Sequence, residues 1–154
     1  MRVVSRSLLL ASALVLTTAR AEAARVRATL LVSPSKEDRA LAERVRGQTS
    51  DLDAQIVVRD ARALPPTLEA RLREADSIAA AGSTEVVFWF RVVDEEVVIY
   101  AVMRAQDRVL VRSIAGGAGK PSSAMLEAAA IIVRDVIRAL GEGATEVHPL
   151  WWTG

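Results

Sequence analysis

Residues 85–92, which read Glu-Val-Val-Phe-Trp-Phe-Arg-Val, constrain the fold more than any other segment. Their β-branched and aromatic residues favour a β-strand. The centre of the run is apolar at every position, whereas a strand with one solvated face alternates between apolar and polar residues. We therefore expect a central strand of a sheet that is covered on both faces.

The segments before this strand alternate between a strand pattern and a helical pattern. Residues 25–32 and 55–60 are rich in β-branched residues and predict strands. Residues 36–46 and 68–82 carry apolar residues at helical spacing and predict amphipathic helices. Ser35, with Asp38 three positions later, resembles a capping box at the start of the first helix, and we expect Gly47 to end it.

The segments after it predict a meander and a last helix. Short charged turns at 94–95 and 106–107 separate residues 97–103 and 109–114 from the central strand and from each other, which indicates antiparallel hairpins. A glycine-rich break at 116–121 precedes a helix that Ser122 or Ser123 caps and that runs to residue 140, where Gly141 closes it.

This order of elements predicts an α/β fold with three layers. Right-handed crossovers make the first three strands parallel, and the hairpins add two antiparallel strands. The expected sheet is mixed and five-stranded, in the order 2-1-3-4-5, with helices on both faces.

The first 23 residues have the pattern of a secretory signal peptide. A positive start with Arg2 and Arg6 precedes an apolar core of about a dozen residues. Ala21 and Ala23 form a small-x-small cleavage site before Ala24. The core is too short for a span of about 20 residues. We expect a periplasmic or secreted protein with a single domain at 24–143, a tryptophan-containing tail at 144–154 and no membrane span after cleavage.

Removing this segment changes the charge balance. The whole chain has 20 basic and 19 acidic residues, and the first 23 carry three of the basic and one of the acidic ones. The remainder has 17 basic and 18 acidic residues, a formal net charge of −1. Nucleic-acid binding therefore has no electrostatic support. The chain also has no cysteine, so its core must be stable without disulfides.

Four polar residues are candidates for a small-ligand site. In the expected sheet the strand order reverses beside the first strand, and a ligand crevice opens at such a point, at the carboxyl ends of the first and third strands. Ser33 and Ser35 follow the first strand, Asp60 ends the second strand beside it, and Arg91 ends the third. The alternative is structural, since serines cap helices and aspartates occupy turns.

Other chemistry finds little support in the sequence. Lys120 follows a glycine cluster, but Ile114 and Pro121 break the phosphate-loop spacing. Asp51 and Asp53 have a spacing that some metal sites use, without a third acidic residue nearby. There is no cysteine or nucleophile-elbow motif. We predict no cofactor and no metal, and favour a non-catalytic protein over an enzyme.

The tail contains Trp151 and Trp152, two of the three tryptophans of the chain. Tryptophan is enriched where proteins bind partners. Paired indoles also stabilise a terminus by folding back onto the domain. The sequence leaves both uses open.

Residues 46–52, 86–90 and 126–134 together resemble segments of a group of secreted or envelope α/β proteins of myxobacteria-like Gram-negative bacteria. The resemblance implies an envelope location and a single domain, and no particular activity. The expected strand order is also similar to that of the amino-terminal domain of the periplasmic TolB family, which implies a protein-interaction module with an envelope protein as partner. The alternative is a ligand-binding or enzymatic domain that uses the crevice.

Overall fold

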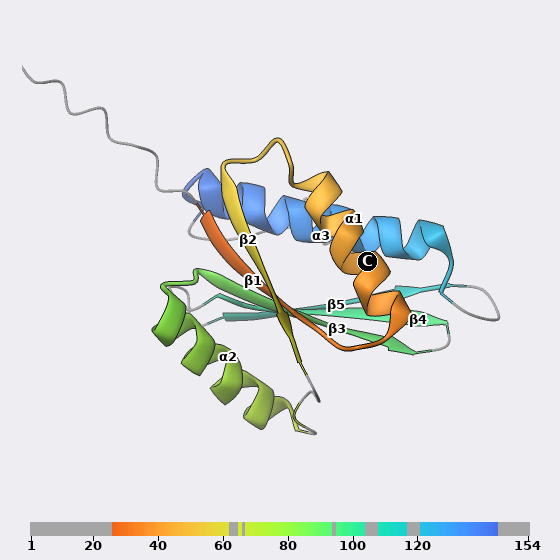
Figure 1. Cartoon of the computed structure of the whole chain (residues 1–154), viewed down its shortest axis with the longest axis horizontal. Coiled ribbons are helices and arrows are strands. Elements are labelled where there is room, and N and C mark those ends of the chain that lie inside the picture. The colour runs from red at the N-terminus through yellow and green to blue at the C-terminus, as the bar shows by residue number, and fades with distance from the viewer. Residues whose placement is uncertain are drawn as a thin grey trace, which may run out of the picture.

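The computed structural model describes residues 26–61, 65, 67–93, 95–103, 108–116 and 121–144. These residues form five strands and three helices (Figure 1). In chain order they are β1 (Val26–Val32), α1 (Lys36–Gln48), β2 (Ala54–Asp60), α2 (Leu68–Gly82), β3 (Val86–Val93), β4 (Glu96–Met103), β5 (Arg108–Ala115) and α3 (Ser123–Gly141).

The strands form one mixed sheet in the order β2-β1-β3-β4-β5. Strand β1 pairs in parallel with both β2 and β3, so that Leu30 lies opposite Val58 on one side and Phe88 on the other. The pairs β3–β4 and β4–β5 are antiparallel. The predicted fold class and strand order are confirmed.

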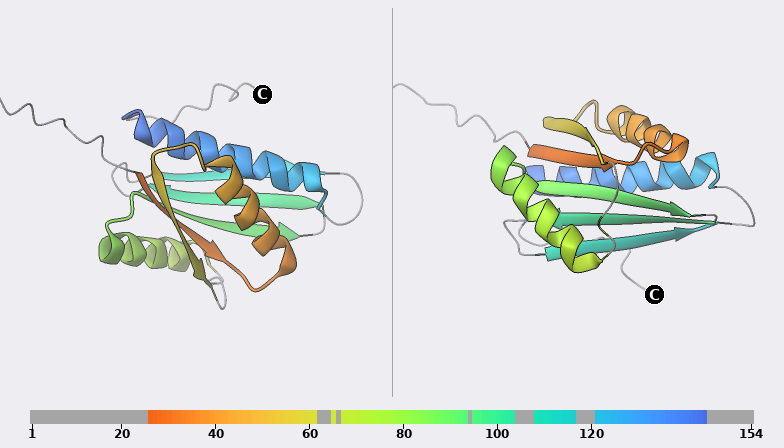
Figure 2. Two further views of the ribbon diagram at one scale, coloured as in Figure 1. Left: turned by 45° about the horizontal axis from the view of Figure 1, so that its top comes forward. Right: turned by 60° about the horizontal axis from the view of Figure 1, so that its bottom comes forward.

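The helices cover the sheet from both sides and make three layers (Figures 1 and 2). Val86, Phe88 and Phe90 of β3 pack in the core beneath α1 and α3. The alternate residues Val87 and Trp89 pack in a second, smaller cluster beneath α2. All five are buried, which is why this strand has no polar face and why the sequence identifies it as central.

The α2 side of the sheet contains an aromatic stack. The ring of Trp89 lies on that of Tyr100 from β4, with centroids 5.2 Å apart and planes 5° from parallel. The guanidinium of Arg71 on α2 lies 5.5 Å from the centre of the Tyr100 ring, within the range of a cation–π contact. This helix is therefore held over β3 and β4 by ring contacts as well as by aliphatic packing.

Two predicted helix ends are wrong. Helix α1 continues through Gly47 and ends at Gln48, because Thr49 closes it: the Thr49 hydroxyl donates to the carbonyl of Val45 at 2.8 Å. Helix α3 includes Gly141, and it is Gly143, with a φ of 75°, that turns the chain. The amide of Gly143 donates to Leu140 and that of Ala144 to Ala139, the two bonds of a Schellman motif.

Candidate functional site: a groove beside an edge strand

Strand β5 is an edge of the described sheet and carries apolar residues on both faces. It pairs with β4 on one side, and no described strand lies on the other side of its backbone. Val109 and Val111, 39% and 46% exposed, lie on the same face of the sheet as α2. They stay exposed because α2 packs on β3 and β4 and stops short of the edge. Natural edge strands usually avoid such exposed apolar residues, because they promote pairing with another chain.

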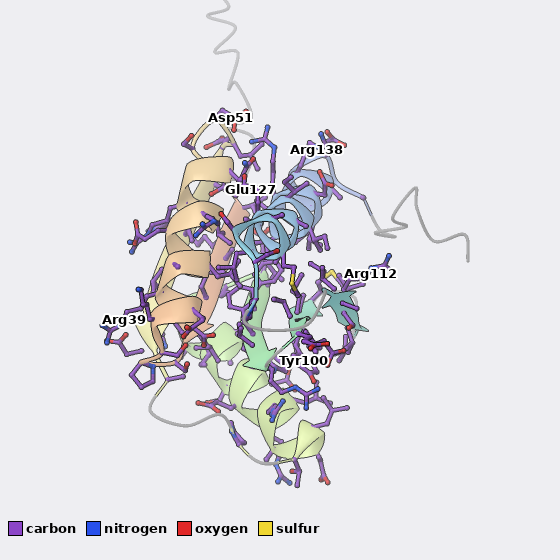
Figure 3. The ribbon with its side chains drawn as sticks, turned by 90° about the vertical axis from the view of Figure 1, so that its right-hand side faces the viewer. Arg39, Asp51, Tyr100, Arg112, Glu127 and Arg138 are labelled. Carbon is purple, nitrogen blue, oxygen red and sulfur yellow. The ribbon has the colours of Figure 1, made fainter. Side chains whose placement is uncertain are left out.

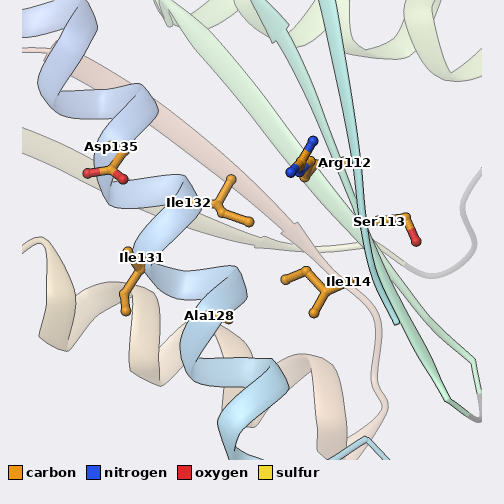
Figure 4. Close-up of a pocket in the computed structure, with 7 residues that line it drawn as sticks. All are labelled: Arg112, Ser113, Ile114, Ala128, Ile131, Ile132 and Asp135. Carbon is orange, nitrogen blue, oxygen red and sulfur yellow. The ribbon is translucent and has the colours of Figure 1, made fainter. Parts of the chain in front are cut away.

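The opposite face of β5 borders a groove against α3, with a volume of about 430 Å³. Arg112, Ser113 and Ile114 line it from the strand, and Ala128, Ile131, Ile132 and Asp135 line it from the helix. In Figure 4 the side chains of Ile114 and Ile132 point toward each other across the groove. The lining is mostly aliphatic, with Arg112 and Asp135 as its charged groups. Such a surface favours apolar side chains over a polar metabolite.

Helix α3 crosses the sheet from the edge strand toward the centre. Near its start, a Cβ on Gly116, just after β5, would lie 2.2 Å from the sulfur of Met125. At its end, a Cβ on Gly141 would lie 3.4 Å from Val26 in β1. The helix accordingly contacts β5, β4 and β1. Because it leaves the edge strand along its length, a groove stays open between the two elements.

Polar contacts with α1 hold α3 in this position. The guanidinium of Arg134 donates to both carboxylate oxygens of Asp51, at 2.5 and 2.8 Å, and also to the carbonyl of Gln48. The hydrogen bond from Arg134 lowers the pKa of Asp51 below its ordinary value of 3.8 and raises the pKa of Arg134. Gln48 also donates to Glu127, which Figure 3 shows between the two helices.

Of the four predicted crevice residues, Ser35 is the N-cap of α1 and Ser33 hydrogen-bonds in the turn just before it. The Ser35 hydroxyl accepts from the amide of Asp38 at 3.0 Å, as an N-cap residue does. The carboxylate of Asp38 accepts from the Ser33 amide at 3.1 Å. The Ser33 hydroxyl in turn accepts from the Ser35 amide at 3.4 Å. These two serines therefore have the structural role that the sequence left open beside the ligand-binding one.

The other two, Asp60 and Arg91, lie at the same end of the sheet. Asp60 ends β2 opposite Val32, while Arg91 lies two residues beyond the Leu31–Trp89 pair of β1 and β3. Both are exposed. Arg91 makes an ion pair with Glu96 of β4 at 3.6 Å, and Glu96 also accepts from the hydroxyl of Ser113 on β5. The structure thus places the four predicted residues at the carboxyl ends of the parallel strands, with Arg91 paired across the hairpin.

The remaining sequence candidates are the tail tryptophans, the cleavage residues and Asp51. Trp151, Trp152 and the cleavage residues Ala21, Ala23 and Ala24 lie outside the described residues. Asp51 binds Arg134, and within the described ranges no three His, Cys, Asp or Glu side chains are grouped as a metal ion would need. None of the described helices has the length and hydropathy of a membrane span.

Sequence reasoning missed the groove, although two signals point to it. Val109 and Val111 face one side of β5, and Leu110 and Ile114 flank Arg112 on the other, so that both faces of this edge strand carry apolar residues. Ile131 lies outside the buried face of α3, which Leu126, Ala130, Val133 and Ile137 form, and is 43% exposed. An isoleucine outside the stripe of an amphipathic helix indicates a second apolar contact.

Comparisons with known proteins give a partial likeness to a solved structure. No protein family model matches the chain, and neither does any curated protein. The crystal structure of TolB from Acinetobacter baumannii is similar to it with a TM-score of 0.46 and 15% sequence identity. That alignment covers 77% of this chain and 28% of the TolB chain, so this chain spans little more than a quarter of that protein.

Proposed function

We propose that this protein is a non-catalytic interaction module of the bacterial envelope, which binds an extended segment of a partner protein along β5. The observation that carries the proposal is the apolar groove between β5 and α3, next to an edge strand with exposed valines. The periplasmic or secreted location rests on the signal-peptide pattern of residues 1–23.

Strand addition fits both faces of this edge. A segment that pairs with β5 forms hydrogen bonds with its backbone, and its side chains point alternately to the two faces of the sheet. One set enters the groove beside Ile114 and Ile132. The other set covers Val109 and Val111, which α2 leaves exposed. A segment with apolar residues on both faces therefore matches the site better than an amphipathic one.

Selection of peptides tests this proposal directly. Displayed random peptides of ten residues are selected against residues 24–154, and the affinity of a selected peptide is measured by fluorescence anisotropy. The groove variant is Ile131→Lys, which places a charge beside the aliphatic lining without disturbing a buried residue. The matched controls are Leu68→Lys on α2 and Val57→Lys on the opposite edge strand β2, where both side chains are also exposed.

We expect Ile131→Lys to weaken peptide binding by about tenfold or more, the effect of losing about 1.4 kcal/mol at an interface. Both controls should stay within about twofold, since they leave the groove unchanged. Bound peptide should also slow hydrogen exchange at the backbone amides of β5, because strand addition pairs them. Two results contradict the proposal: peptides that bind Ile131→Lys as tightly as they bind the parent, and peptides that slow hydrogen exchange at the amides of β2 and not at those of β5.

The small-molecule crevice stays a prediction, supported by the shared position of Ser33, Asp60 and Arg91 at one end of the sheet. A thermal-shift screen of metabolites, sugars and metal ions tests it. A compound that raises the melting temperature of the parent and not of Asp60→Ala would support a ligand-binding or enzymatic role. An equal shift in both proteins would remove Asp60 from the site.

A further inference from the structure

We propose that the groove between β5 and α3 has an occupant within the same chain, the tail at residues 145–154, whose Trp151 and Trp152 fill it. The inference rests on the groove of the proposed function and adds a regulation to it. A partner segment must displace the tail before it binds.

The tail starts at the end of the sheet where β5 begins. Helix α3 ends at Gly141, beside Val26 at the amino end of β1. Strands β3 and β5 are both antiparallel to β4, and β1 is parallel to β3, so β5 begins at the end where β1 begins. A tail that follows the groove therefore runs in the same direction as β5 and back along α3.

The tail is long enough to reach the groove. Ile131 lies ten residues before Gly141, about 15 Å along the helix axis. Three strand spacings separate β1 from β5, about 14 Å across the sheet. The two displacements combine to about 21 Å. Ala144 is still hydrogen-bonded to the last turn of α3, so the extended part of the tail starts there. The seven residues from Ala144 to Trp151 span up to about 23 Å, which is enough for both tryptophans to reach Ile131.

The composition of the tail matches the lining. Leu150, Trp151 and Trp152 are consecutive and apolar, and the tail has a single acidic residue, Glu146. The groove presents Ile114, Ile131 and Ile132 and has room for large rings. Pro149 lacks an amide donor, which an edge position tolerates. Docking in the groove removes the two indoles from water and places them against an aliphatic surface within their reach.

Tryptophan fluorescence of residues 24–154 tests the docking, because Trp89 is fully buried and serves as an internal reference. Acrylamide quenching is compared between the parent, the groove variant Ile131→Lys and the matched control Leu68→Lys. We expect all three indoles of the parent and of Leu68→Lys to be shielded. In Ile131→Lys two of the three should become several-fold easier to quench, while far-UV circular dichroism stays unchanged.

Two results would overturn the inference. One is a parent protein in which two of three indoles are already as accessible as in urea. The other is shielding that persists in Ile131→Lys and in a second groove variant, Ala128→Lys, which would place the tail elsewhere. Shielding that disappears on dilution, together with a dimer in sedimentation, would assign the groove to the tail of a second copy and would also contradict docking within one chain.

Removal of the tail separates this inference from the proposed function. A chain that ends at Ala144 keeps every described element. A short linker gives the tail an effective concentration in the millimolar range. If the dissociation constant of the tail is about ten times lower than this concentration, the tail occupies the groove about 90% of the time. We then expect removal to strengthen binding of a selected peptide by about tenfold. Peptide binding that is unaffected by removal refutes tail docking alone, whereas no peptide binding to either chain refutes the proposed function.

Discussion

The buried pair Thr29 and Thr84 offers a direct test of how polar groups are accommodated beneath α2. Thr29 on β1 and Thr84, just before β3, are 1% and 8% exposed, and their hydroxyls lie 3.1 Å apart in a hydrogen bond. We predict that Thr29→Val and Thr84→Val each destabilise the protein, and that the double variant is more stable than either single one. Valine has the shape of threonine, so packing is nearly unchanged in all three.

The magnitude follows from the hydroxyl that is left behind. A single substitution removes one partner and leaves the other hydroxyl buried without a hydrogen bond, at a cost of about 1–3 kcal/mol. The double substitution removes both hydroxyls, and replacing both partners with apolar groups of the same shape is nearly neutral. The two single costs therefore should not add, and the coupling free energy should approach their sum, about 2–6 kcal/mol in favour of the double variant.

Urea unfolding of residues 24–154, followed by far-UV circular dichroism, measures the four proteins of this cycle. With an m-value of about 1.5 kcal/mol/M, a loss of about 1.5 kcal/mol lowers the midpoint by about 1 M. We expect this decrease in each single variant and a midpoint near that of the parent in the double variant. Costs that add within about 0.5 kcal/mol would refute the reasoning, because they would mean that the hydroxyls do not depend on each other.

Three further predictions concern other polar groups. Because the hydrogen bond from Arg134 lowers the pKa of Asp51, this carboxylate stabilises the fold above its ordinary value of 3.8, and the stabilisation is lost as the pH falls through the lower folded pKa. The difference in urea midpoint between the parent and Asp51→Asn should therefore be present at neutral pH and shrink below pH 3.8. A difference that is the same at pH 7 and in strong acid would contradict this pairing. Ser35→Ala removes the N-cap of α1 and should cost about 0.5–2 kcal/mol in urea unfolding, while Ser35→Asp, which restores an acceptor, should recover most of it. The indole nitrogen of Trp89 is buried and has no acceptor among the described residues. Trp89→Phe removes this donor, which offsets about 1–3 kcal/mol of the lost packing. It should therefore cost much less than Trp89→Ala, for which about 3–5 kcal/mol is expected. Equal losses in these two variants would contradict this prediction.

Most of the fold could be predicted because its signals are local. The apolar run at 86–90 could only be a strand with two covered faces, and α2 on one side with α1 and α3 on the other provide that cover. The short turns after β3 impose antiparallel pairing, and the crossovers through α1 and α2 impose parallel pairing. The cap formed by Ser35 and Asp38 could be predicted as well, since its two residues lie within one helical turn.

The errors at helix ends arise from competition between neighbouring residues. Glycine often ends a helix, which is why Gly47 is a candidate, but the hydroxyl of Thr49 closes α1 two residues later. Gly141 and Gly143 are both plausible ends for α3, and the choice depends on which of them adopts a positive φ. Composition identifies the candidates, and the hydrogen bonds of the last turn select between them.

Local patterns in the sequence were enough to assign the helices and strands, their order in the sheet and the N-cap of α1 at Ser35. The ion pair between Asp51 and Arg134 and the apolar groove between β5 and α3 emerged from the three-dimensional arrangement. The difference lies in the range of the interactions. Periodicity and capping involve residues within a turn or two, whereas a groove between residues 112–114 and 128–135 depends on the angle at which a helix crosses a sheet, and this angle is set by the packing of the whole core.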